Sequence, residues 1–159
     1  LALISTSISN VLLQSISEKF RDNKSLIKDL LLILTIVAII GIAEIIVITF
    51  FGIGLFKLFF GELWGFSGRI SQILVWSYAL NFLVASFSAI FISMNKIKIL
   101  SIWQLIYFIS ILSLILFKNY PFIDFLKVYV IIEVSCYLII IALMFYIVLN
   151  YEKRIKIRV

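Results

Sequence analysis

Two carboxylates inside long apolar runs are the residues of this chain best suited to chemistry in an apolar setting. Glu44 lies about two-thirds along the run Leu30 to Phe51, and Glu133 lies about one and a half turns inside the run Val128 to Leu149. An ionised carboxylate at the centre of a spanning helix costs roughly 2.5 to 3.5 kcal/mol, so such groups usually face protein or water and often mark a transport path. Both residues are therefore candidates for a substrate or ion pathway.

Each carboxylate also has a purely structural interpretation. Either group could be protonated, or paired with Lys57 or Arg69. Glu133 is close enough to the end of its run to extend its side chain toward the membrane interface. We therefore expect Glu44, rather than Glu133, to have the larger role in transport or ion coupling.

A set of small and polar side chains shares one helix face in the run from Ile70 to Met94. The face is formed by Ser77, Asn81, Ala85 and Ser88, spaced i, i+4, i+8 and i+11. We expect this face to point into the protein. It could pack against another helix through close contacts and interhelical hydrogen bonds, or it could line a polar cavity with Asn81 on the pathway.

Other catalytic and metal-binding patterns are missing from the sequence. The chain has no histidine and one cysteine, Cys136, which excludes a disulfide framework and a His/Cys metal cluster. Its serines lack a histidine base, and neither a Walker loop nor a dinucleotide-binding glycine pattern occurs. We predict a protein that is not an enzyme and needs no metal or cofactor, with Cys136 as a small buried packing residue.

The composition identifies the elements that must position these groups. Hydrophobic residues make up 64% of the 159 residues and charged residues 14%, and the mean hydropathy is +1.23, which excludes a soluble fold. Runs of about 20 apolar residues satisfy their backbone hydrogen bonds as helices, and Leu30 to Ile40 lacks the alternation of a barrel strand. The sequence predicts one all-α transmembrane domain over 1–159, a polytopic bundle of four full spans and a partial N-terminal helix, at 1–17, 30–51, 70–94, 99–117 and 128–149.

The stretch before the first full span resembles the interior of a longer protein. Leu1 to Ser17 is apolar with scattered polar residues, and it has neither the charged start nor the small-residue cleavage site of a signal peptide. We expect a helix entered partway, with an N-terminal part missing.

Basic residues are distributed unevenly between alternate loops. Such residues are retained on the cytoplasmic side, so the richer side should be cytoplasmic, the C-terminal tail included. The net charge of +6 is explained by anionic lipid headgroups and requires no nucleic acid. Ten basic residues lie on the richer side and four on the other: Lys19, Arg21, Lys24, Lys28, Lys96, Lys98, Lys153, Arg154, Lys156 and Arg158, against Lys57, Arg69, Lys118 and Lys127.

A set of motifs between the first two full spans and within the second carries a family resemblance. Its positions are Phe60, Gly61, Glu62, Trp64, Gly68, Trp76, Ser86 and Ser88. Over roughly Ile8 to Leu149, the chain resembles the second half of the polysaccharide biosynthesis proteins. These are the O-antigen and capsule oligosaccharide flippases of the multidrug/oligosaccharidyl-lipid/polysaccharide exporter superfamily. Val75 and Phe87 stand where that family often has proline, and Ser67 stands for an alanine.

The resemblance implies a two-half transporter of about twelve or more helices, of which this chain would be the C-terminal part. Family members move an undecaprenyl-pyrophosphate-linked oligosaccharide across the bacterial inner membrane by alternating access, so the lipid-linked oligosaccharide, the missing N-terminal part and glycan assembly proteins are the implied partners. Lys57, Arg69 and Lys118 become candidates for meeting the anionic headgroup at the outer mouth, although each could equally be an interfacial anchor.

Two other functions fit the sequence. A drug or metabolite exporter of the same superfamily would have a smaller cavity and ion-coupled efflux. A membrane-embedded glycan polymerase or glycosyltransferase, or a scaffold subunit for one, would need a catalytic Asp or His in a long external loop. The predicted external loops are short, with Asp124 as their one aspartate.

Overall fold

Helices account for nearly all of the chain in the computed structural model, which describes the backbone of residues 2–158 and the side chains of residues 3–155. No strand occurs in the described backbone, so the predicted all-α fold is confirmed. In chain order the elements are α1 (Ala2–Arg21), α2 (Ile27–Phe60), the 3-10 helix η1 (Glu62–Trp64), α3 (Gly65–Phe87), α4 (Ala89–Ser93), α5 (Ile97–Leu112), the 3-10 helix η2 (Ser113–Phe117) and α6 (Phe122–Arg158).

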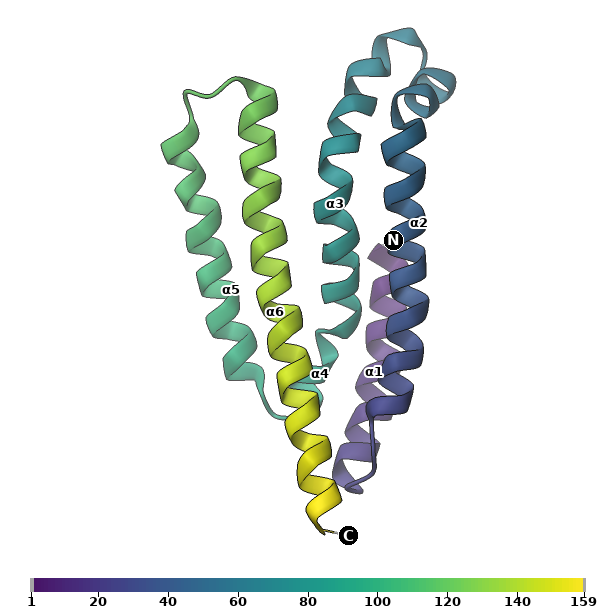
Figure 1. The fold of residues 1–159 in the computed structure, drawn as a ribbon, viewed down its shortest axis with the longest axis vertical. Helices are drawn as coiled ribbons and strands as arrows, with labels where there is room; N and C mark the ends of the chain where they lie inside the picture. The colour runs from purple at the N-terminus through teal and green to yellow at the C-terminus, as the bar shows by residue number, and fades with distance from the viewer. Residues whose placement is uncertain (1, 159) are drawn as a thin grey trace.

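Four helical stretches are long and apolar enough to cross a membrane: Ile27–Phe60, Glu62–Ser93, Ile97–Phe117 and Phe122–Ile155. Their number, length and composition match those of a multi-pass membrane protein. The α1–α2 loop, the α4–α5 turn and the C-terminal end of α6 lie at one end of the bundle, and the α2–α3 turn and the α5–α6 loop lie at the other (Figure 1). We call the first the basic end, since it carries the richer set of basic residues; the side chains of Lys156 and Arg158 lie outside the described residues.

The loop predicted between residues 18 and 29 is much shorter in the structure. Helix α1 continues to Arg21, and the chain reverses at Asn23, whose φ of 53° lies in the left-handed region that asparagine tolerates. Helix α2 then begins at Ile27. Of the mixed charges that suggested a loop, Asp22 and Lys24 lie in the shortened loop, and the others lie on the last turns of α1 and the first turn of α2.

The predicted spans 30–51 and 70–94 leave the glycine-bearing stretch from Gly52 to Gly68 outside both helices, and this is wrong for most of the stretch. Helix α2 continues through Gly52 and Gly54 to Phe60, and only Gly61 breaks the chain direction, with φ at 99°. A β-carbon at Gly61 would meet no atom within 4 Å, so glycine is favoured there by its backbone conformation and not by crowding.

The predicted 70–94 span is divided in two at Ser88. Helix α3 ends at Phe87 and α4 follows from Ala89. The Ser86 hydroxyl donates to the Phe82 carbonyl (2.8 Å) and the Ser88 hydroxyl to the Ala85 carbonyl (3.0 Å). Serine hydroxyls that bond to the preceding turn compete with backbone N–H groups and bend helices, so this break needs no proline.

The last helix is longer than the predicted 128–149 at both ends. Pro121 precedes it, and its carbonyl accepts hydrogen bonds from the N–H groups of Asp124 (3.0 Å) and Phe125 (2.9 Å). Proline is favoured at helix starts because its missing N–H would be unpaired there. Because the helix begins at Phe122, only residues 118–121 of the predicted 118–127 loop remain a loop. At the other end the basic tail is helical to Arg158.

Close backbone contact joins α2 and α3. A β-carbon at Gly68 would lie 2.6 Å from the Ile53 Cα and 2.8 Å from the Gly52 carbonyl oxygen. The Gln72 amide donates to the Thr49 carbonyl (2.8 Å) beside this crossing. Small residues permit such close packing in membranes, where helix association depends on van der Waals contact rather than on the hydrophobic effect.

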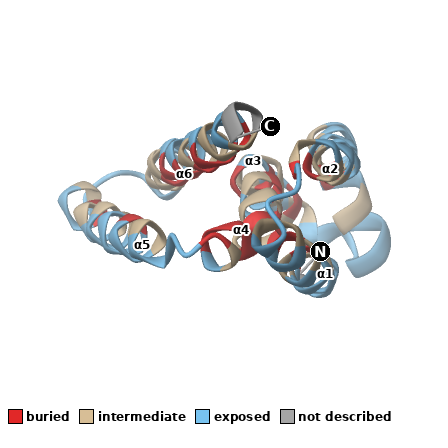
Figure 2. Ribbon diagram, turned by 90° about the horizontal axis from the view of Figure 1, so that it is seen from below, coloured by how far each residue is buried: buried red, intermediate tan, exposed pale blue. Residues whose placement is uncertain are grey.

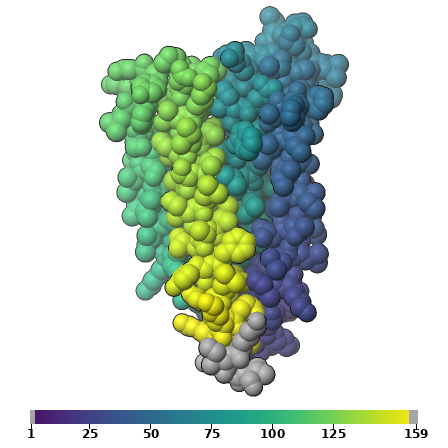
Figure 3. Space-filling model, viewed as in Figure 1, coloured from purple at the N-terminus to yellow at the C-terminus, as the bar shows by residue number. Residues whose placement is uncertain are grey.

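The apolar core lies around the α3–α4 break, where α1, α2, α4 and α6 converge. Buried residues line the inner sides of these helices (Figure 2). The outward faces of α2 and α5 are wide and exposed, drawn in pale blue. Only 11% of the most apolar window of α2 and of α5 is buried, which suits faces exposed to lipid. On the face shown in the space-filling view, α6 lies between α5 and α3 (Figure 3). Core residues include Leu12, Leu26, Val37, Phe87, Ile90, Phe91 and Ile140.

Candidate functional site

Glu133 is enclosed by hydroxyl groups from two other helices. It lies about three turns into α6, and it is 3% exposed. The Ser77 hydroxyl on α3 donates to one carboxylate oxygen, and the Tyr107 hydroxyl on α5 donates to the other at 2.5 Å. The expected reach toward the interface is therefore wrong, because the longer helix places Glu133 well inside the bundle.

A second polar contact lies one turn further along α3 and α6. The Asn81 amide donates to the Tyr137 hydroxyl at 2.7 Å, and that hydroxyl lies 3.5 Å from the Glu133 carboxylate. Ser77 and Asn81 are four residues apart on α3, as Glu133 and Tyr137 are on α6, so the two pairs form successive rungs between the helices.

Aromatic rings hold this cluster from the side of α5. Trp103 and Tyr107 stack with centroids 5.6 Å apart, and Tyr107 and Tyr137 with centroids 5.9 Å apart. The Trp103 indole donates to the Cys136 carbonyl at 2.9 Å. Cys136 itself is buried, as predicted. We call Ser77, Asn81, Tyr107, Glu133 and Tyr137 the polar belt.

Glu44 lies on the other side of α3. Its side chain is half-buried on α2, and its Oε2 atom is buried with no hydrogen-bond partner among the described residues. It lines an open groove of about 500 Å³, together with Ser5, Thr6, Tyr78, Asn81, Phe82 and Ala85. Asn81 therefore borders the groove and also reaches the polar belt.

The predicted inward face of α3 thus has two roles. Ser77 is 1% exposed and packs against α6, whereas Asn81 and Ala85 line the groove and Ser88 is half-buried at the helix break. Helix packing and cavity lining were stated as alternatives, and successive turns of one face adopt each of them.

The ion pairs with Lys57 or Arg69, which were the structural alternative for the two carboxylates, do not form among the described residues. Lys57 binds Glu62 instead, with Nζ and Oε2 2.7 Å apart. Arg69 is exposed on α3, and Lys118 is exposed in the α5–α6 loop. These three cations lie near the α2–α3 turn or in the α5–α6 loop, and both connections are at the end of the bundle opposite the basic end (Figure 1). The structure does not place the three cations with Glu44 or Glu133 in one cluster.

The family-motif positions form the α2–α3 connection and its packing. The Phe60 and Trp64 rings lie 5.5 Å apart around the Gly61 turn. Trp64 and Trp76 are 49% and 50% exposed, which suits aromatic groups near a membrane interface or in lipid. The other positions have contacts described above: Glu62 pairs with Lys57, Gly68 crosses Gly52, and Ser86 and Ser88 bond to α3 carbonyls.

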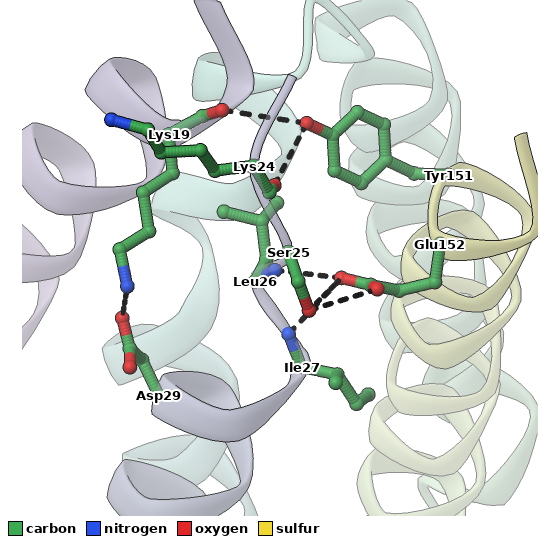
Figure 4. A network of polar contacts seen from close by, with 8 residues as sticks. All are labelled: Lys19, Lys24, Ser25, Leu26, Ile27, Asp29, Tyr151 and Glu152. Carbon is green, nitrogen blue, oxygen red and sulfur yellow. Dashed lines mark hydrogen bonds and ion pairs between the residues drawn. The ribbon is translucent and has the colours of Figure 1, made fainter. Parts of the chain in front are cut away.

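A second fully buried carboxylate, Glu152, was missed from the sequence because it lies among basic residues. From α6 it accepts hydrogen bonds from the N–H groups of Leu26 (2.6 Å) and Ile27 (3.1 Å), and from the Ser25 hydroxyl (Figure 4). The N-cap residue Leu26 has no side-chain acceptor of its own. Glu152 therefore caps α2 from another helix, where its charge also complements the helix dipole.

Further contacts fasten the α1–α2 loop in the same region. Lys19 and Asp29 form an ion pair, and the Tyr151 hydroxyl donates to the carbonyls of Lys24 (3.1 Å) and Lys19 (3.5 Å) (Figure 4). Contacts from α6 thus fix the α1–α2 loop at the basic end.

Comparison with protein families, curated proteins and solved structures gave no match for this chain.

Proposed function

We propose that this chain forms part of a transporter that moves a lipid-linked oligosaccharide across the bacterial inner membrane. The resemblance of the 60–88 segment to the oligosaccharide flippases suggests the substrate class. The four-span bundle and its intramembrane polar groups support transport as the activity. Such a protein makes and breaks no covalent bond.

The observation that carries the proposal is the groove beside α3. Glu44 brings a carboxylate, and Asn81 and Tyr78 bring an amide and a hydroxyl, to an open groove of about 500 Å³ within predicted spanning helices. Polar groups at this depth are costly unless they face protein, water or a polar substrate. A carboxylate with a free acceptor can accept hydrogen bonds from sugar hydroxyls, which are the groups that must cross hydrocarbon.

The anionic end of the substrate requires a different environment. Glu44 would repel a pyrophosphate, so Lys57, Arg69 and Lys118 at the far end of the bundle are the proposed partners of the headgroup. The two parts of the substrate would then lie at different places along the pathway, with the sugars near the groove and the pyrophosphate near the cations.

Disruption of the gene that encodes this chain tests the proposal. Surface glycan should be lost, and lipid-linked precursor should accumulate on the inner side of the membrane. Reintroduction of the intact gene should restore both. Normal surface glycan in the disrupted strain would reject the assignment.

Exchange of each intramembrane carboxylate tests the pathway itself. Glu44→Gln should impair glycan export more than Glu133→Gln, since Glu44 borders the groove while Glu133 is occupied by Ser77 and Tyr107. Surface glycan should be compared in the complemented strain at matched membrane abundance of the variants. Equal export by both variants would remove the special role of Glu44.

A small-cation exporter is the second candidate, and the same groove favours it. A carboxylate with an unpartnered oxygen attracts organic cations and can exchange protons during efflux. Active efflux of ethidium from cells that keep normal surface glycan would select this function over the first.

A further inference from the structure

A second groove opens at the basic end of the bundle, away from Glu44. It has a volume of about 320 Å³ and lies between the end of α1, the α4–α5 turn and the last turns of α6. Its lining is part polar and part apolar. The residues that matter for recognition are Phe20, Lys96, Ile99, Tyr146, Asn150 and Arg154.

The groove carries two cations that no carboxylate neutralises among the residues that the structure describes. Lys96 and Arg154 form no ion pair among the described residues, although four carboxylates lie at this end. Those carboxylates contact other groups, namely Gln14 for Glu18, Lys24 and Arg21 for Asp22, Lys19 for Asp29, and Ser25 with the α2 N-terminus for Glu152.

The Asp22 carboxylate is an example of a charge at this end that is paired with another residue. Lys24 Nζ donates to it at 3.0 Å, and this hydrogen bond, together with the Lys24 charge, holds the pKa of Asp22 below its usual range. Asp22 is therefore paired with Lys24, and it does not line the groove.

Polarity changes in order along the wall of the groove. Tyr146, Asn150 and Arg154 follow one another at intervals of four residues on one face of α6, from the body of the helix toward its end. On the facing wall Ile99 lies one turn inside α5 from Lys96. The groove is thus apolar and aromatic toward the bilayer and cationic toward the water.

We infer that this groove binds the headgroup of an anionic phospholipid. The phosphodiester lies between Lys96 and Arg154, Asn150 bonds to the ester and glycerol oxygens, and the first acyl carbons lie against Tyr146 and Ile99. Basic pockets between spanning helices are typical sites for anionic lipid headgroups. A soluble phosphate would use the two cations and leave the apolar half of the groove empty. The inference holds whatever substrate the protein transports.

Lipid titration of the purified full chain in a neutral detergent tests this site. Short-chain phosphatidylglycerol and phosphatidylcholine are added, and bound lipid is counted by native mass spectrometry. The double variant Lys96→Gln/Arg154→Gln should weaken phosphatidylglycerol binding by about tenfold or more and abolish the preference over phosphatidylcholine.

The matched control is Lys98→Gln/Lys153→Gln, which removes the same charge from exposed positions at the same end that do not line the groove. Its phosphatidylglycerol affinity should stay within about twofold of the unaltered protein. Circular dichroism verifies equal helix content. Should the double variant lose helix, the single variants Lys96→Gln and Arg154→Gln replace it, each with a smaller loss of affinity.

Three results would overturn the inference. Equal losses in the groove and control variants would mean diffuse surface charge. Equal affinity of the unaltered protein for the two lipids would mean no headgroup recognition. Binding of glycerol phosphate as tight as that of the intact lipid would mean a site for soluble phosphate.

Discussion

Buried Glu133 is held by hydroxyl donors from neighbouring helices, which makes it a structural tie as well as a candidate pathway residue. Its Oε1 and Oε2 atoms each accept a bond from a different helix. Interhelical hydrogen bonds in membranes average about 0.6 kcal/mol, whereas donors left unpaired in a buried site cost about 1 to 3 kcal/mol. Removal of the acceptor should therefore cost more than the bonds themselves contribute.

The Glu133→Ala variant should lose about 1 to 3 kcal/mol of unfolding free energy, since Ser77 and Tyr107 would keep buried hydroxyls with no acceptor. Glu133→Gln keeps an acceptor and a similar shape, so its loss should be below about 1 kcal/mol. Denaturation in mixed detergent micelles measures both. Glu18→Ala, at an exposed position, is the control, and an equally small loss in all three variants would contradict the role of Glu133 as a tie.

The coupling between Glu133 and Tyr107 can be isolated by a double-mutant cycle. Glu133→Ala, Tyr107→Phe and their combination should give a coupling of about 0.6 to 1.7 kcal/mol, the range of interhelical bonds in membranes, because each single change removes the bond. The same cycle between Glu133 and Ser110 should give none, because Ser110 bonds to the Ile106 carbonyl of its own helix. Coupling of equal size in both cycles would mean that any change on α5 affects Glu133, and it would contradict a specific bond between Glu133 and Tyr107.

At this scale the sequence revealed the acids of the spans but not their partners. A charge in an apolar run is visible without a structure, so Glu44 and Glu133 could be identified. Tyr107 and Tyr137 could not, because a tyrosine in an apolar helix looks like any amphipathic core residue and its partner lies on another helix. Glu152 was missed because the surrounding Lys153 and Arg154 made it look like part of a solvated tail.

Among the elements, α2 and α3 depend on a contact between glycines. Gly68→Ala should destabilise the protein by about 1 to 3 kcal/mol, since the new methyl group would overlap the Ile53 Cα and the Gly52 carbonyl, both of which are backbone atoms that cannot rotate away. Gly54→Ala is the matched control. Its methyl group would meet nothing within 4 Å, and alanine favours helix by about 0.5 to 1 kcal/mol over glycine.

Thermal unfolding of the two variants in the same detergent distinguishes these effects. The Gly68 variant should melt lower and the Gly54 variant at or above the unaltered protein. Similar melting of both variants would show that α2 and α3 do not cross closely at Gly68.

The start of α2 depends on α6. Glu152→Ala should cost about 1 to 2 kcal/mol because the Leu26 and Ile27 N–H groups would lose their acceptor at a helix N-terminus. Glu152→Gln keeps a carbonyl acceptor and should cost less. Hydrogen exchange of the first turn of α2 reports the effect locally, and unchanged protection in the alanine variant would contradict the cap.

The number and order of the membrane spans were predictable from apolar runs, and the helix ends were not. A span is recognised by its length in hydrocarbon, but α2 and α6, with 34 and 37 residues, continue past the hydrocarbon thickness of about 30 Å. Charged residues marked the ends of the apolar runs rather than the ends of helices. The break at Ser88 depends on hydroxyl contacts with the preceding turn, which a hydropathy pattern does not contain.

For the whole molecule, the central claim is a four-span bundle whose loops alternate between the two sides of a membrane. The structure places the α1–α2 loop and the α4–α5 turn at one end and the α2–α3 turn and the α5–α6 loop at the other. The excess of basic residues at the first end predicts that it faces the cytoplasm.

Cysteine accessibility in spheroplasts tests this claim most directly. Single cysteines replace Leu63, Asn119, Lys28 or Lys98 in a Cys136→Ser background, and a membrane-impermeant maleimide is added before or after permeabilisation. Cysteines at 63 and 119 should react in intact spheroplasts, and those at 28 and 98 only after permeabilisation. Reaction of all four in intact spheroplasts, or recovery of the chain in the soluble fraction, would contradict the account.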